Sequence, residues 1–258
     1  MIDLYDYSLL TIFLAGLVVI LGAIEIGRRL GVRGGEGESD TASMLAGAAL
    51  GLLALMIGFT FAMALSRFES RRDAVLKEAN AIGTTALRAR LLPEAQRREV
   101  LTLLQDYVKV RLDITQPALT GAALTSAIDR SNALQEKLWQ QATAAAATSD
   151  AMVPTGLFIQ TLNEMIDDQE TRLTALRNRV PDIVMLALFG VAAVAGGFAG
   201  YASMLETHRA VVAVYVMGLL VTAVIMLIFD LDRPTAGFID VSQQPMIDTA
   251  NSIAAFSR

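Results

Sequence analysis

The sequence contains no cysteine and one histidine, His208, among its 258 residues. Without cysteine the chain cannot form disulfides, thiolate metal sites, iron–sulfur clusters or a cysteine nucleophile, and a single histidine excludes a multi-histidine metal centre within one subunit. The sequence also lacks a nucleophile elbow, a Walker loop, a dinucleotide glycine fingerprint and a metal-binding helix motif. We therefore expect a protein that is not an enzyme and that has no cofactor and no bound metal.

Charged residues are scarce as well. They make up 18% of the chain, against 54% hydrophobic residues, and the net charge is -5. Such a composition is too apolar for a soluble domain of this length and is typical of an integral membrane protein. The absence of a basic run argues against binding to nucleic acid. We expect the lipid bilayer of a bacterial inner membrane to be the main partner of the chain.

The stretch from Thr41 to Pro93 organises the rest of the sequence. It has no charge between Asp40 and Arg67, which is long enough to cross a bilayer core of about 30 Å at about 1.5 Å per residue. The following residues are charged and favour a helix, and no proline interrupts them before Pro93. This pattern predicts one long helix that crosses the membrane and continues beyond it.

Four apolar runs predict an all-α integral membrane protein with two transmembrane hairpins. The first hairpin covers residues 1–65, with spans at about 9–26 and 42–65, and the second covers residues 181–230, with spans at about 183–205 and 210–229. Residues 66–180 form the predicted helical insert of three to four helices, and residues 231–258 form a C-terminal tail. The spacings Gly47–Gly51 and Gly196–Gly200 are typical of close helix packing in lipid.

Basic residues near the ends of the spans indicate the orientation. Four spans place both termini and the insert on one side, and this side has eight Lys or Arg residues within about 15 residues of the span ends, against four on the other. The acidic N-terminus and three arginines in the first loop argue for the opposite orientation. We expect the insert and both termini to be cytoplasmic.

Polar residues in the predicted helices give a few candidate sites. Glu78 and Asn80 precede Gly83 in the middle of the long helix, where Asn and Gly are poor helix formers; they indicate either a polar site or local packing with a hydrogen bond. Glu25, at the end of the first span, is either an interfacial partner of a neighbouring arginine or a carboxylate in an ion pathway. Thr60 is the most central polar side chain of the second span, and it can bond to a carbonyl one turn back.

Several segments together resemble a known family. The segments GFTFAMALSRFESRR, EANAIGTTALRARLLP, YVKVRLD and DLDRPTAGFIDVSQQPM are similar to a widespread bacterial membrane-protein family, the DUF4239-type family described as bestrophin-like. The resemblance covers nearly the whole chain. Through this family the chain is distantly similar to bestrophins, which are pentameric anion channels with four spans per subunit.

The resemblance implies specific roles for residues of the second span. In bestrophins this span lines the pore and apolar side chains one turn apart form a narrow neck, which carries over to Ile57 and Phe61, with Phe68 further along the same face and Thr60 beside them. Ordinary packing is the alternative role of these side chains. Arg67, Arg71 and Arg72 would attract anions at the pore mouth, or would serve as interfacial anchors. Two acidic residues, Asp230 and Asp232, are too few to identify the acidic cluster that binds calcium in bestrophins.

Two functions from different classes follow. The first is an oligomeric ion channel, a homo-pentamer by resemblance, that passes inorganic ions and is anion-permeable, with span two lining the pore. The alternative is a non-conducting membrane sensor or scaffold whose helical insert binds a ligand or a partner protein. The subunit number discriminates between them, because a pore of this kind needs a closed ring.

Overall fold

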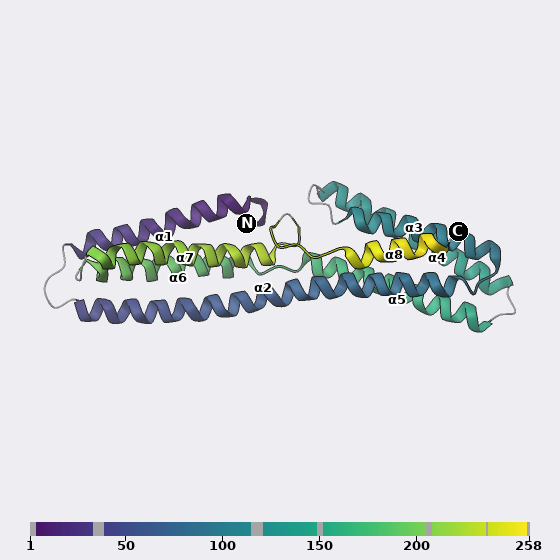
Figure 1. Cartoon of the computed structure of the whole chain (residues 1–258), viewed down its shortest axis with the longest axis horizontal. Coiled ribbons are helices and arrows are strands. Elements are labelled where there is room, and N and C mark those ends of the chain that lie inside the picture. The colour runs from purple at the N-terminus through teal and green to yellow at the C-terminus, as the bar shows by residue number, and fades with distance from the viewer. Residues whose placement is uncertain are drawn as a thin grey trace. The chain divides into compact units, whose positions relative to one another are not determined.

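The computed structural model describes residues 4–32, 39–114, 121–148, 152–204, 208–235 and 237–256. Within these residues every regular element is a helix (Figure 1), which confirms the predicted all-α fold class. The elements are η1 (Leu4–Asp6), α1 (Leu9–Gly31), α2 (Ser39–Ala89), α3 (Glu94–Asp113), α4 (Gly121–Thr148), α5 (Met152–Arg177), α6 (Asp182–Ser203), α7 (His208–Asp232) and α8 (Gln244–Phe256).

Prolines and apolar runs account for most helix limits. Pro93 and Pro181 are the N-cap residues of α3 and α6, positions at which the missing N–H of proline costs nothing. Helix α2 runs without a break for 51 residues, as the uninterrupted sequence up to Pro93 predicts. The C-terminal tail contains one helix, α8, among its described residues.

Four stretches are helical, long and apolar enough to cross a membrane. They belong to α1, to α2, to the stretch that contains α6, and to α7; Asp182 is the one charged residue of α6. The chain is therefore a multi-pass membrane protein with four candidate spans.

The chain divides into two compact units. The first unit contains α1, α6, α7 and the first part of α2, and the second contains the rest of α2 together with α3, α4, α5 and α8. The boundaries within α2 and after α5 lie at Arg67 and Arg179, and three residues of the tail, Gly237–Ile239, belong to the first unit.

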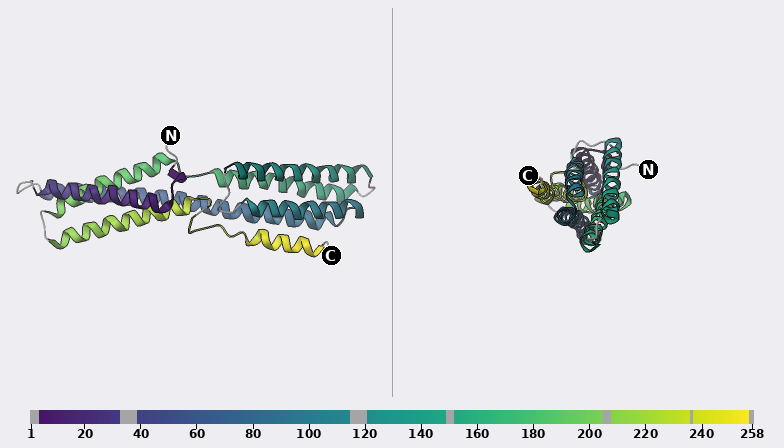
Figure 2. Two further views of the ribbon diagram at one scale, coloured as in Figure 1. Left: turned by 90° about the horizontal axis from the view of Figure 1, so that it is seen from above. Right: turned by 90° about the vertical axis from the view of Figure 1, so that its right-hand side faces the viewer.

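In the first unit, α1, α6 and α7 pack against one another as a bundle of three helices (Figures 1 and 2). Small residues bring α1 and α6 close together. A Cβ atom added at Gly27 would lie 2.0 Å from the Gly197 carbonyl oxygen, and one at Gly200 would lie 2.2 Å from the Ile24 carbonyl oxygen. The Gly196–Gly200 spacing thus lies at a close helix contact. At Gly47 and Gly51 an added Cβ would meet no atom of the described residues within 4 Å.

The second unit has a continuous apolar core to which each of its helices contributes. Ile82 of α2, Leu104 of α3, Leu138 of α4 and Phe158 of α5 are all fully buried in it. Helix α8 adds Met246 and Ile253 and lies alongside α3 (Figures 1 and 2). Thr249 also donates a hydrogen bond from its hydroxyl to the Ala79 carbonyl oxygen (3.2 Å), which attaches α8 to α2.

Candidate functional site

The first part of α2 is the least covered of the four candidate spans. In its most apolar window 17% of the residues are buried, the smallest share among the spans. Ala46, Leu53 and Thr60, seven residues apart, form the buried stripe that faces the other helices of the first unit. The opposite side of the helix carries large apolar side chains, of which Leu55 is 54% and Phe59 is 65% exposed.

The four residues predicted to line a pore differ in how far their side chains are buried. Thr60 is buried, and its hydroxyl donates to the Met56 carbonyl oxygen (2.7 Å), so it lies on the stripe that packs inside the unit. Ile57 is half-buried and Phe61 is 36% exposed, at the margins of this stripe. Phe68 is half-buried and belongs to the second unit.

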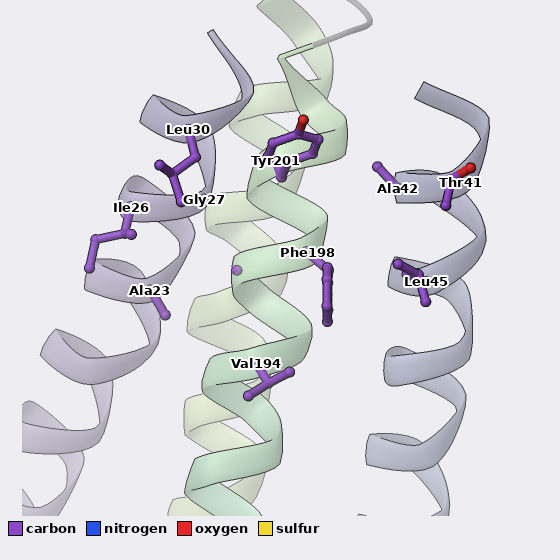
Figure 3. Close-up of a pocket in the computed structure, with 11 residues that line it drawn as sticks. Ala23, Ile26, Gly27, Leu30, Thr41, Ala42, Leu45, Val194, Phe198 and Tyr201 are labelled. Atoms are coloured by element: carbon purple, nitrogen blue, oxygen red, sulfur yellow. The ribbon is translucent and has the colours of Figure 1, made fainter. Parts of the chain in front are cut away.

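An apolar cavity of about 670 Å³ lies between the start of α2 and the helices α1 and α6 (Figure 3). Figure 3 shows α6 as its back wall, with Val194, Phe198 and Tyr201, and α1 and α2 on its two sides. Leu45 of α2 therefore faces α6 across open space. The start of α2 is loosely attached to the three-helix bundle, which leaves most of its apolar surface for lipid or another subunit.

The three arginines predicted at a pore mouth have different environments. Arg67 is largely buried and its Nε lies 4.0 Å from the Asp232 carboxylate. Arg71 is buried, and Arg72 is exposed. Arg72 alone among these three presents its charge to the surface of the chain.

The acidic residues in the last turn of α7 act as hydrogen-bond acceptors for the backbone and for tyrosine. Asp232 accepts from the Tyr5 hydroxyl and from the Val180 N–H (2.8 Å). Asp230 accepts from the N–H groups of Phe238 (2.7 Å) and Ile239 (3.1 Å). These contacts organise the chain around the end of α7. Within the described ranges, no three His, Asp or Glu side chains gather as a possible metal site.

Glu25 forms a second polar cluster near the end of α1. Its carboxylate accepts from Arg28 (2.7 Å) and Arg29 (2.7 Å) on the same helix and from the Tyr215 hydroxyl of α7 (2.5 Å). Glu25 thus pairs with two neighbouring arginines of α1 and links α1 to α7.

Glu78 lies at the centre of a buried charge cluster in the second unit. Its carboxylate accepts from Arg111 Nε (2.5 Å) and Nη2 (3.2 Å) on α3, and from Arg172 Nη1 (2.6 Å) on α5. All three side chains are at most 1% exposed. Two cations against one anion leave an excess positive charge, and Arg111 Nη1 and Arg172 Nε have no hydrogen-bond partner in the part of the chain that the structure describes.

Neutral polar groups extend this cluster. The Tyr107 hydroxyl lies 3.2 Å from Glu78 and 2.9 Å from Gln169 Oε1, and it accepts from Gln135 Nε2 (3.4 Å). Burial, supported by the nearby Glu78 charge, raises the pKa of Tyr107 far above its usual range, so the hydroxyl stays neutral. The cluster therefore joins α2, α3, α4 and α5. Arg172 also donates to Gln243 Oε1 (2.8 Å), just before α8.

Asn80, predicted with Glu78 as a polar site, lies on another side of α2. Its side chain is exposed and lines a small cavity of about 330 Å³ with Gly83 of α2 and Thr249 of α8. The backbone carbonyl oxygen of Asn80 accepts a hydrogen bond from the Thr84 hydroxyl (2.9 Å). The structure thus separates Asn80 from the buried cluster.

The partners of Glu78 were not predicted from the sequence. One signal for burial was present, because Glu78 falls on the helical stripe of Val75 and Ile82, and a charge in an apolar stripe needs a buried partner. Sequence alone offers no means of choosing Arg111 and Arg172, which are 33 and 94 residues away, among the other arginines.

These features define a helical multi-pass membrane protein with four candidate spans and a helical insert that carries a buried charge cluster. A family model for the Bestrophin-like domain matches residues 12–246, and the chain therefore belongs to the bestrophin-like family. A comparison of the chain with curated proteins finds no significant match.

Solved structures show the same fold. A bacterial bestrophin homologue from Klebsiella pneumoniae is 16% identical, with a TM-score of 0.70, and the match covers 97% of this chain and 98% of the homologue. A variant of a Klebsiella pneumoniae bestrophin homologue with a tryptophan-to-alanine mutation is 15% identical, with a TM-score of 0.71 and the same coverage. At this identity the likeness establishes the fold.

Proposed function

We propose that this chain forms an oligomeric ion channel, permeable to anions, in which the first part of α2 lines the pore. One observation carries the proposal: this part of α2 has a long apolar face that is left uncovered by the described residues of its unit, with Phe59 65% exposed. Membership of the bestrophin-like family supports it. Five subunits around a central axis is the assembly that the family resemblance favours.

The exposure pattern suggests which side chains form the narrow part of the pore. Leu55 and Phe59 are four residues apart and so lie one above the other on one side of the helix. At about 100° per residue, Phe61 points about 200° away from Phe59. Leu55 and Phe59 are therefore stronger candidates for an apolar constriction than Ile57 and Phe61. Apolar constrictions of this kind gate ion flow by excluding water.

Charge near the end of the span supports anion permeation. Arg72 is exposed, whereas Arg67 and Arg71 are more enclosed. In the proposed channel Arg72 raises the local anion concentration, and the effect falls as salt rises. The charge count along the sequence favours a cytoplasmic insert and cytoplasmic termini in this assembly.

Two measurements test the proposal. Native mass spectrometry of the solubilised protein gives the subunit number, and we expect a ring of five. Chloride flux into proteoliposomes is then measured for Phe59→Ala and Phe61→Ala, which make the same change on opposite sides of α2. We expect Leu55→Ala and Phe59→Ala to raise basal flux because they widen the constriction. Val18→Ala, which shortens an exposed apolar side chain of α1 (72% exposed), serves as the control.

Specific results would refute the channel. A monomer or dimer without a central opening excludes a pore, and favours the sensor or scaffold whose insert binds a ligand. A ring without chloride flux refutes conduction of chloride. If Phe61→Ala and Ile57→Ala raise flux while Phe59→Ala and Leu55→Ala behave like Val18→Ala, the pore lies on the other side of α2.

A further inference from the structure

A concave basic surface lies in the second unit, where the end of α2 meets α3 and α8. It is a cavity of about 750 Å³, within the size range of small-molecule sites. Its walls combine guanidinium groups with apolar side chains and a threonine. They include Arg90 and Leu91 from the turn after α2, Arg97, Arg98 and Thr102 from α3, and Phe256 from α8.

Positive charge exceeds negative charge in this cavity. Glu94, in the first turn of α3, forms ion pairs with both Arg97 (3.7 Å) and Arg98. Arg90 lies with its guanidinium 4.9 Å from the centre of the Phe256 ring, and it has no ion pair with any carboxylate of the described residues. Three guanidinium groups against one carboxylate leave an excess of two positive charges.

One further feature increases the positive potential of this cavity. Helix α3 begins at Glu94, and Pro93 at its N-cap provides no side-chain acceptor for the first N–H groups, so the positive end of the helix dipole is not capped by a side chain. An anion that enters the cavity therefore meets positive groups from the turn after α2 and from α3.

We propose that this cavity binds a soluble anion that carries phosphate groups. Guanidinium groups match phosphate oxygens in paired hydrogen bonds, and several around one concave site favour a multiply charged anion. A single chloride ion neither fills a cavity of about 750 Å³ nor engages three arginines. The apolar side chains of Leu101 and Phe256 allow the bound anion to carry an organic group. The proposal does not depend on channel activity.

Pyrophosphate binding to the full-length protein tests the proposal. Isothermal titration is performed in nanodiscs of phosphatidylcholine at low salt, and we expect saturable binding that weakens as salt is added. Arg90→Gln and Arg97→Gln should each weaken binding about tenfold, the loss of one charge-assisted contact at a solvent-accessible site. Arg130→Gln removes an exposed arginine of α4 and should leave the affinity unchanged.

Glu94→Gln provides a test with the opposite sign. It removes the carboxylate that competes with the anion for Arg97 and Arg98, so binding should tighten several-fold. The fluorescence of Trp139, the single tryptophan of the chain, shows whether each variant is folded. The same titration with ATP in place of pyrophosphate shows whether an organic group increases the affinity.

Three results would overturn the proposal. The first is the absence of saturable pyrophosphate binding to the folded protein. The second is an equal loss of affinity in Arg130→Gln and Arg90→Gln, or weaker binding in Glu94→Gln. The third is competition by phosphatidylglycerol in the nanodisc, which would assign the cavity to a lipid headgroup rather than a soluble anion. Chloride flux, measured separately, reports on the channel and not on this site.

Discussion

Replacement of Glu78 by glutamine should destabilise the second unit more than any other charge-neutralising change on α2. Glutamine keeps the size of the side chain, but it removes the charge that compensates Arg111 and Arg172, and it turns an acceptor oxygen into a donor. At an effective dielectric constant of about 20, one charge pair at 4 Å is worth about 4 kcal/mol, and Glu78 makes two such pairs, with shortest contacts of 2.5 and 2.6 Å.

The net cost is smaller than the sum of these attractions, because the buried carboxylate itself is costly. Removing one partner of a buried ion pair typically costs about 3–5 kcal/mol. For a urea dependence of about 2 kcal/mol per molar, this lowers the unfolding midpoint by about 2 M. Trp139 lies on α4 in the second unit, so its fluorescence follows the unfolding of this unit in the full-length protein.

A control and a double variant make this result specific. Glu69→Gln changes an exposed glutamate of the same helix and should shift the midpoint by a small fraction of this amount. Combining Glu78→Gln with Arg172→Gln removes one of the two uncompensated charges, so the double variant should lose about 1–3 kcal/mol less than the sum of the single variants. The reasoning is wrong if Glu78→Gln costs no more than Glu69→Gln, or if the two changes are additive.

Three other substitutions have clear expected outcomes. Tyr107→Phe leaves the buried Gln135 and Gln169 side chains without a hydroxyl partner, and should cost about 1–3 kcal/mol in the same urea titration; no change in midpoint would contradict it. Gly200→Ala places a Cβ 2.2 Å from the Ile24 carbonyl oxygen, so it should separate α1 from α6 and lower thermal stability in detergent. Gly51→Ala places a Cβ that meets no atom of the described residues within 4 Å, and it should be tolerated. Equal thermal stability of the two variants would argue against the close α1–α6 contact. Asp232→Ala removes the acceptor of the buried Val180 N–H and of Tyr5, and should cost about 1–3 kcal/mol, while Asp248→Ala, on an exposed side of α8, should have little effect on thermal unfolding.

The sequence predicts where the helices of this protein begin and end better than it predicts which of their faces are buried. Apolar runs and prolines locate the spans and the starts of α3 and α6, because both act locally along the chain. The apolar half of α2 has no polar side to mark its orientation, so sequence alone did not distinguish the side of Phe59 from that of Phe61. That distinction comes from packing, which buries Leu53 and Thr60 against the other helices.

The buried face of α2 in the second unit suggests why a costly charge cluster is kept there. Apart from Val75 and Ile82, this face is built largely of alanine, including Ala74, Ala79 and Ala86, and small side chains of one kind distinguish weakly between neighbouring rotations of a helix. Glu78 removes this ambiguity, because a shift of one residue turns its carboxylate by about 100° away from Arg111 and Arg172 and leaves all three charges buried without partners. We therefore infer that the cluster selects one rotation of α2 against α3 and α5, and that its value to the protein lies in this selection more than in net stability.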